Sequence, residues 1–171
     1  MHTIYTIGHS TRTIEQFLEL LRAHGIQQIV DVRTVPKSRH NPQFGKEALA
    51  ASLEQAGIAY THLEKLGGLR HTSKDSVNLG WQNSSFRGFA DYMATPEFQT
   101  GLAELKTVAE KKTVAIMCAE AVPWRCHRSL IADALITQGW QVLHIQSRKT
   151  AQPHELTPFL KVQDGKLTYP A

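Results

Sequence analysis

The two cysteines of the chain, Cys118 and Cys126, stand at either end of a seven-residue loop, AEAVPWR. The first ends a short apolar run, TVAIMC, and the second precedes a segment whose apolar residues repeat at helical spacing. A cysteine reacts as its thiolate, and a helix amino terminus or a nearby cation lowers its pKa. Cys126 has both features by sequence, because three basic residues flank it: Arg125, His127 and Arg128. The spacing therefore indicates a reactive thiol between a strand and a helix.

This pair of thiols has two interpretations. In the first, either cysteine attacks an electrophile as a nucleophile or redox thiol, and the other resolves the product as a disulfide. In the second, both are small buried apolar residues, and the Met-Cys-Ala sequence at the end of a strand fits this for Cys118. We favour the first interpretation, because both thiols occupy the place where open α/β sheets bind their ligands.

Two residues beside the thiols are candidates for proton transfer, Glu120 and His127. Glu120 has three roles open to it: a base, an ion-pair partner of Arg125 or Arg128, or a metal ligand. Together with the cysteines, these two residues contain the donor atoms of a metal site. Their spacing matches no standard zinc pattern. The sequence therefore requires no cofactor and leaves a metal as a variant of the thiol hypothesis.

Strands and helices alternate along the chain and would position these residues. Short apolar runs predict strands over residues 3–7, 28–32, 58–63, 114–117 and 140–145. Helical spacing, caps and stops predict helices over residues 14–24, 46–56, 86–93, 97–110 and 127–138. The Asp164-Gly165 pair predicts the turn of a hairpin. The order predicts an α/β fold, a three-layer single domain with a mostly parallel sheet between helices and a C-terminal hairpin.

Parallel strands bring their carboxyl ends to one edge of a sheet, and basic, polar and glycine residues follow these strands. They are His9, Ser10, Asp31, Arg33, Gly67, Gly68, Arg70 and Arg128. The carboxylates lie mainly on the predicted helices instead. This asymmetry predicts an anion-binding cleft in which Arg33, Arg70 and Arg128 hold the anion. Alternatively, the basic residues lie in solvated loops, and Ser10 belongs only to a turn.

Two pairs in these loops have specific alternatives. Alternation along a strand points Asp31 and Arg33 to the same side, so that an ion pair would orient Arg33 within the site. Asp31 is equally suited to capping the neighbouring loop. The Gly67-Gly68 pair lets backbone amides approach a ligand closely, or forms an ordinary turn.

Size and composition restrict the class of protein. The chain has 171 residues and a formal net charge of +4, which suits one domain with a buried core and favours an anionic ligand weakly. No apolar run approaches the roughly 20 residues of a membrane span. The start, MHTIYTIGHS, lacks the apolar core of a secretory signal. We therefore expect a cytoplasmic protein with reduced thiols and no membrane partner.

Several motifs, in order along the chain, resemble those of a known family. They are YTIGHS, DVR, the Pro36 and Ser38 pair, LGG with Arg70, and MCAE followed by CHR. In these motifs the chain is similar to the bacterial and archaeal family called domain of unknown function 488, from Tyr5 to about Ile145. The resemblance implies no particular activity. It implies one shared site made of His9, Asp31, Arg33, Arg70, Cys118, Glu120, Cys126, His127 and Arg128.

A fainter resemblance is to rhodanese and cysteine-phosphatase domains, which also have a DVR-like strand end and a cysteine loop that runs into a helix. The loop of this chain departs from theirs. Six residues separate Cys118 from Arg125 where the phosphatase loop has five, and AEAVPW contains no glycine. A ring of backbone amides around an oxyanion is therefore not expected. We carry over the location of the site and neither activity.

Two functions remain as hypotheses. The first is a cytoplasmic thiol-dependent enzyme, a hydrolase or transferase, that acts on a small anionic or nucleotide-like substrate. A metal-dependent enzyme that uses the same Cys, Glu and His cluster is its variant. The second is a nucleic-acid or nucleotide binding module without catalysis, which would use the basic loops and the polar segment 70–85. The sequence leaves the number of subunits open.

Overall fold

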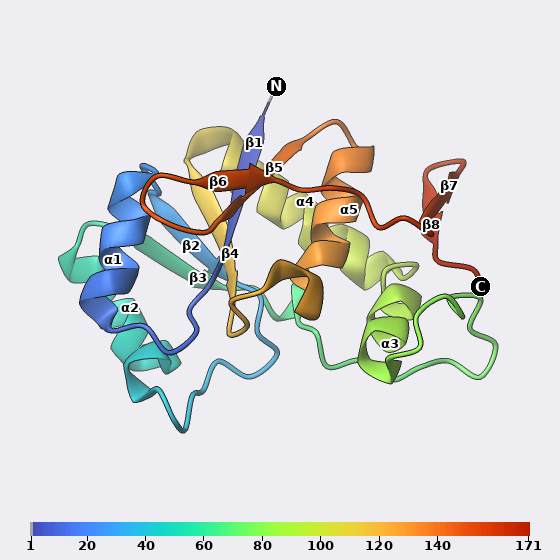
Figure 1. The fold of residues 1–171 in the computed structure, drawn as a ribbon, viewed down its shortest axis with the longest axis horizontal. Coiled ribbons are helices and arrows are strands. Elements are labelled where there is room, and N and C mark those ends of the chain that lie inside the picture. Colours follow the sequence, from blue (N-terminus) through green and yellow to red (C-terminus); the bar gives the residue numbers. More distant parts are fainter. Residues whose placement is uncertain (1) are drawn as a thin grey trace.

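A computed structural model describes residues 2–171 of the chain. These residues form a six-stranded sheet, shown in Figure 1. Its spatial order is β3 (Ala59–His62), β2 (Gln28–Asp31), β4 (Val114–Cys118), β1 (Thr3–Gly8), β5 (Gln141–Ile145) and β6 (Ala151–Pro153). The first five strands in this order are parallel, and β6 runs antiparallel to β5. The carboxyl ends of the five parallel strands therefore share one edge.

Within the described residues the α-helices are α1 (Ile14–Ala23), α2 (Lys46–Gln55), α3 (Ser84–Tyr92), α4 (Pro96–Lys111) and α5 (Arg128–Thr137). Short 3₁₀ turns are η1 (Pro42–Phe44), η2 (Glu64–Leu66) and η3 (Pro123–Arg125). Helix α1 starts at the predicted capping box, in which Thr13 Oγ1 accepts from the Gln16 backbone and Gln16 Oε1 accepts from the Thr13 backbone. No helix in residues 2–171 combines the length and the apolar character needed to cross a membrane.

The sheet has a buried core on each face, with α1 and α2 on one side and α3, α4 and α5 on the other (Figure 1). Side chains alternate along β4. Ala115 and Met117 pack toward α1 and α2, whereas Val114, Ile116 and Cys118 pack toward α5. The predicted three-layer α/β arrangement with a mostly parallel sheet is confirmed. Cys118 belongs to the face that α5 covers.

Neighbouring strands β1 and β4 send the chain to opposite faces, because α1 follows β1 and α5 follows β4. Such a point in a parallel sheet opens a crevice outside the carboxyl ends of the strands. The two strand ends are in register, with Gly8 opposite Cys118 and the His9 backbone N–H donating to the Cys118 carbonyl. A Cβ at Gly8 would lie 1.8 Å from the Glu120 carbonyl oxygen, so the loop after β4 closes over a glycine.

The carboxyl-terminal region contains one predicted and one unpredicted feature. The predicted hairpin is present as β7 (Lys161–Gln163) and β8 (Lys166–Thr168), with φ of 52° at Asp164 and 77° at Gly165 in its turn. Strand β6 was not predicted. It is three residues long and ends in Pro153, so it has too few residues to show a period of two, and its proline suits only an edge strand.

Candidate functional site

The two thiols that the sequence singled out are in contact. Cys118 ends β4, and Cys126 lies between η3 and α5. Their sulfur atoms are 2.7 Å apart, and the residues are buried, with 3% and 7% of their surface exposed. Both are free cysteines. The backbone N–H of Arg128, the first residue of α5, donates to Cys126 Sγ at 3.5 Å. The junction of strand, loop and helix thus places both thiols at one point.

Arg128 is completely buried and contacts one of these sulfurs. Its Nη1 donates to Cys118 Sγ at 2.9 Å and to the Glu120 carbonyl at 2.5 Å, and its Nη2 donates to the Ala121 carbonyl at 3.0 Å. Within residues 2–171 its Nε has no hydrogen-bond partner and no carboxylate forms an ion pair with it. A buried cation needs a compensating anion. The group that can supply this anion by losing a proton is the Cys118 thiol, which the Arg128 guanidinium contacts.

Burial by itself raises the pKa of both thiols. For Cys118, the hydrogen bond from Cys126 and the charge of Arg128 outweigh burial and lower the pKa to about 7. For Cys126, burial and the adjacent Cys118 act in the same direction and raise the pKa well above its ordinary value. The first proton that the pair loses therefore leaves a thiolate on Cys118, to which the thiol of Cys126 donates a hydrogen bond.

The imidazole of His127 lies beside Cys126 and is held by two backbone carbonyls. Its Nε2 lies 2.8 Å from the Val32 carbonyl and 3.0 Å from the Leu66 carbonyl. Because carbonyls only accept hydrogen bonds, Nε2 carries the proton, and Nδ1 presents its lone pair 3.5 Å from Cys126 Sγ. Burial lowers the pKa of His127 to about 4. His127 is therefore uncharged and a weak base near neutral pH.

The glycine pair makes room for this ring and for the loop after β2. A Cβ on Gly68 would lie 2.6 Å from His127 Nδ1, and one on Gly67 would lie 2.6 Å from Thr34 Oγ1. Thr34 Oγ1 in turn accepts a hydrogen bond from the Leu69 backbone N–H at 2.8 Å. The close approach that these glycines allow is to protein side chains, and Gly68 also borders the pocket described next.

Both cysteines line a pocket of about 270 Å³ at the carboxyl edge of the sheet. Its charged residues are Arg33, Arg125 and Glu120. Arg33 is 7% exposed, and its Nη1 has no hydrogen-bond partner in residues 2–171. Arg33 thus brings a guanidinium to the pocket and keeps one buried N–H group without a partner. Of the three arginines assigned to an anion from the sequence, only Arg33 lines this pocket.

The predicted ion pair between Asp31 and Arg33 is present and buried. Arg33 donates through Nε to Asp31 Oδ1 at 2.9 Å and through Nη2 to Asp31 Oδ2 at 2.6 Å. Burial lowers the pKa of Arg33, but the hydrogen bonds and charge of Asp31 outweigh it and raise that pKa. Tyr60 also donates to Asp31 Oδ2, at 2.5 Å. In the β2–β3 register Asp31 lies opposite His62, and alternation along β3 puts Tyr60, two residues earlier, on the same side as His62.

His9 lies behind the pocket, on the other face of the sheet from the cysteines. Its ring stacks on Phe44 with centroids 4.4 Å apart, and Phe44 belongs to the core under α1 and α2. His9 Nδ1 lies 2.8 Å from the Ser10 carbonyl, and burial lowers the pKa of His9. Ser10 has a φ of 51°, which is a turn conformation. Neither residue borders the pocket of the two thiols.

Ser38 and Arg70 also lie outside this pocket. Ser38 Oγ accepts from the Asn41 backbone N–H at 3.1 Å, within the loop after β2. The Arg70 guanidinium stacks on the ring of Tyr92, with its central carbon 3.7 Å from the ring centroid, and donates to the Gly67 carbonyl at 3.1 Å. These contacts hold the Arg70 guanidinium against Tyr92 of α3.

Glu120 borders the pocket without pairing to an arginine. Its Oε1 accepts from the Val122 backbone N–H at 3.2 Å, and no ion pair in residues 2–171 involves it. Arg128 contacts the backbone carbonyl of Glu120 in place of its carboxylate. The described residues contain no group of three His, Cys, Asp or Glu arranged around a metal ion. The predicted ion pair of Glu120 with Arg125 or Arg128 is therefore absent from the described residues.

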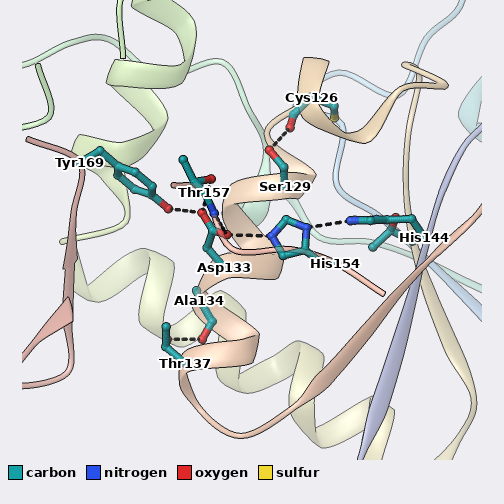
Figure 2. A network of polar contacts seen from close by, with 10 residues as sticks. Cys126, Ser129, Asp133, Ala134, Thr137, His144, His154, Thr157 and Tyr169 are labelled. Carbon is teal, nitrogen blue, oxygen red and sulfur yellow. Dashed lines mark hydrogen bonds and ion pairs between the residues drawn. The ribbon is translucent and has the colours of Figure 1, made fainter. Parts of the chain in front are cut away.

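A second polar cluster, which the sequence did not indicate, surrounds Asp133 of α5 (Figure 2). Asp133 Oδ1 accepts from His154 Nε2 at 2.7 Å, and His154 Nδ1 lies 2.8 Å from His144 Nε2. Asp133 Oδ2 accepts from the hydroxyls of Thr157 at 2.7 Å and Tyr169 at 2.8 Å. The cluster joins α5 and β5 to residues near the carboxyl end of the chain.

This cluster borders a larger pocket of about 350 Å³, whose wall includes Ser129, His144 and His154. The polar groups of the cluster are already engaged with one another. The Ser129 hydroxyl donates to the Cys126 carbonyl at 2.9 Å, and both ring nitrogens of each histidine have partners, with Thr6 Oγ1 on His144 Nδ1. The smaller pocket, which holds two free thiols, is therefore the better candidate active site.

The comparisons with known proteins support one family. Residues 13–135 match the family model described as Domain of unknown function DUF488. This span contains both cysteines, Asp31, Arg33 and Arg128, and it leaves out the YTIGHS motif. No curated protein and no solved structure matches the chain, and the fainter likeness to rhodanese and cysteine-phosphatase domains gains no support from them. The chain belongs to the family described as domain of unknown function DUF488.

Proposed function

We propose that the protein is a cytoplasmic, thiolate-dependent enzyme that acts on a small anionic electrophile, with Cys118 as its nucleophile. The supporting observation is the 2.9 Å contact between Arg128 Nη1 and Cys118 Sγ. Because this buried guanidinium has no carboxylate partner in residues 2–171, the thiolate form of Cys118 is the state that balances its charge. A lowered pKa distinguishes reactive cysteines from inert buried ones.

In the reaction, Cys118 Sγ forms a bond to the electrophilic atom, and the leaving group departs with its electron pair. The thiol of Cys126, 2.7 Å away, is the nearest proton donor to that group. Arg125 and Arg33, which both line the pocket, hold the anionic part of the substrate. His127 lines the pocket as a neutral imidazole, so Arg128 is the cation that contacts the Cys118 thiolate.

The size of the pocket favours a small substrate. Its volume of about 270 Å³ lies just below the range of roughly 300–1,000 Å³ that is usual for drug-sized ligands. The nucleophile is only 3% exposed, so a bulky electrophile would not reach it without movement of the loop. A nucleic-acid binding module, the alternative function, would have no need for a thiolate at Cys118.

Two alkylating reagents of similar size and different charge test this proposal. Iodoacetate is an anion and iodoacetamide is neutral. The ratio of the iodoacetate rate to the iodoacetamide rate should be higher for the native protein than for the unfolded protein. Cys118→Ser should abolish the fast reaction. Arg125→Ala should reduce the preference for iodoacetate, because Arg125 lines the pocket. Arg148→Ala is the matched control, since Arg148 is exposed and pairs with Glu19.

The reaction rate should rise with pH with a midpoint near 7, as the pKa of Cys118 implies. Mass spectrometry of peptides identifies which cysteine carries the label. Native thiols that react no faster than those of the unfolded chain at neutral pH, or a label placed on Cys126 alone, would contradict the assignment of Cys118 as nucleophile.

A further inference from the structure

We infer that Cys118 and Cys126 form a dithiol pair that reduces a small hydroperoxide and closes to a disulfide. The inference rests on the proposed function, because it takes Cys118 as the nucleophile. It adds the class of electrophile, the oxygen–oxygen bond of a hydroperoxide whose anionic group Arg125 and Arg33 hold, and it gives Cys126 a chemical task of its own.

The first argument is the position of the second thiol. Cys126 Sγ is 2.7 Å from Cys118 Sγ, and the two residues meet from opposite ends of the same loop. A substituent placed on Cys118 therefore forms within reach of Cys126. If that substituent were an acyl or phosphoryl group, attack by Cys126 would only move it from one thiol to the other. If it were bound through a weak sulfur–oxygen bond, attack by Cys126 on Cys118 Sγ would release it and form a disulfide.

The second argument is charge. Buried Arg128 favours one thiolate, and while Cys118 is ionised the pKa of Cys126 is raised by burial and by its neighbour. Once Cys118 becomes an uncharged sulfenic acid, that repulsion disappears and Arg128 is left without an anion. Cys126 is then the remaining acid next to Arg128, whose backbone N–H already donates to Cys126 Sγ at 3.5 Å. The negative charge passes from one sulfur to the other, which makes Cys126 nucleophilic only after Cys118 has reacted.

The third argument is access. The cysteines are 3% and 7% exposed, and they border a pocket of about 270 Å³. Each sulfur atom of a disulfide substrate carries an organic group, and one of these groups would have to come close to Cys118 Sγ. A hydroperoxide needs to bring only its terminal oxygen atom to Cys118. The burial of the sulfurs therefore favours the peroxide.

The reaction balances as follows. Cys118 thiolate attacks the terminal peroxide oxygen; the sulfur–oxygen bond forms, the oxygen–oxygen bond breaks, and the alkoxide takes a proton from the Cys126 thiol to leave as an alcohol, or as water from hydrogen peroxide. Cys126 thiolate then attacks Cys118 Sγ. The sulfur–sulfur bond forms, and hydroxide leaves and takes a proton from solvent. The two sulfurs lose two electrons in total, which reduce the peroxide, and an external dithiol reductant restores the thiols.

Hydrogen peroxide is the probe for the test, with glutathione disulfide as the bulkier arm. One equivalent of peroxide should remove both thiols of the native protein and lower its mass by two hydrogen atoms, with a Cys118–Cys126 crosslink in the peptide map. At neutral pH the rate should exceed that of free cysteine by about tenfold, from the larger thiolate fraction at a pKa near 7 than at about 8.5. Glutathione disulfide should react much more slowly.

The single variants separate the two steps. Cys126→Ser should stop at a sulfenic acid on Cys118, which dimedone traps, and Cys118→Ser should leave Cys126 unreactive toward peroxide. Dimedone labelling of the wild-type protein with Cys126 still a free thiol would overturn the inference, as would peroxide oxidation no faster than that of free cysteine. If Cys118 still reacts rapidly with iodoacetate in that case, the proposed function stands and only the peroxide chemistry fails. If neither reagent reacts, both fail.

Discussion

Arg128 and Cys118 meet at 2.9 Å inside the protein, where a guanidinium touches a sulfur and, within residues 2–171, no carboxylate. The contact couples a charge that cannot be removed near neutral pH to a group that can lose its proton there. Cys118 lines the pocket, whereas Arg128 does not. The charge state of the thiol should therefore depend on this arginine as well as on the hydrogen bond from Cys126.

Replacing Arg128 with Met is expected to raise the pKa of Cys118 above its value of about 7, because only the hydrogen bonds from Cys126 and the backbone then oppose burial. The ultraviolet absorbance of the thiolate, followed across pH, measures this without a reagent that must enter the pocket. Arg125→Ala is the control, because Arg125 lines the pocket without contacting either sulfur and should leave the titration unchanged. A folded Arg128→Met protein with the wild-type midpoint would contradict the role of this cation.

Tyr60→Phe should lower the free energy of unfolding by about 1 to 2 kcal/mol, because the hydroxyl donates to a buried carboxylate oxygen of Asp31. Asp31 would keep its contacts with Arg33, so the fold should survive. Urea unfolding measures the difference. Tyr5→Phe is the matched control, since Tyr5 packs on the same core and its hydroxyl has no hydrogen bond in the described residues; it should change stability by less than about 0.5 kcal/mol. Equal effects of the two changes would argue against the Tyr60 contact.

Gly68→Ala should destabilise the protein by about 1 to 3 kcal/mol and disturb the pocket, because its Cβ would lie 2.6 Å from His127 Nδ1. The ring has little freedom to move, since Nε2 is held by two carbonyls. Thermal unfolding and the rate of Cys118 alkylation both report on the change. Gly45→Ala is the comparison, with its nearest atom at an ordinary 3.4 Å. Unchanged stability and alkylation in Gly68→Ala would show that the loop carrying residue 68 moves aside at no cost.

The free energy of unfolding should fall in acid because of the buried His144. Burial lowers the pKa of His144 from 6.5 to about 3 in the folded protein. The unfolded chain therefore binds a proton that the folded protein excludes, and stability present above pH 6.5 is lost as the pH falls toward 3. The loss is about 1.4 kcal/mol per pH unit for one such group.

Urea unfolding at a series of pH values tests this slope. His144→Gln should be less dependent on pH by about 1.4 kcal/mol per unit between pH 6 and 4. Part of the slope should remain, because burial also lowers the pKa of His127, to about 4. His40→Gln serves as the control at an exposed position of the loop after β2. Parallel curves for the wild-type and His144→Gln proteins would contradict the assignment to His144.

Most of the fold could be predicted from interactions between residues that are close in the sequence. The capping box at Thr13 and Gln16 and the Asp164-Gly165 turn are interactions between near neighbours, and both are present as expected. The alternation of strands and helices was sufficient to predict the parallel sheet. Strand β6 was not predicted, because its pairing with β5 defines it and its own residues show no strand pattern.

The site was predictable as a location and less so as a set of contacts. Cys118 and Cys126 meet because the ends of a strand and a helix are joined by one short loop. His9 follows a neighbouring strand, yet it packs on the opposite face, where stacking on Phe44 holds it. The direction of Arg70, a loop residue, depends on Tyr92 at the end of α3, and spacing contains no information about that contact. Long side chains in loops follow their tertiary partners.

Asp133 gives a practical rule for where this fold can be cut. It lies just inside the span that the family model matches, 13–135, yet the donors to its carboxylate come from His154, Thr157 and Tyr169. A chain shortened to residue 135 would lose strand β5 and every side chain that donates a hydrogen bond to this carboxylate. A working boundary for expression or transplantation of this unit belongs beyond Tyr169.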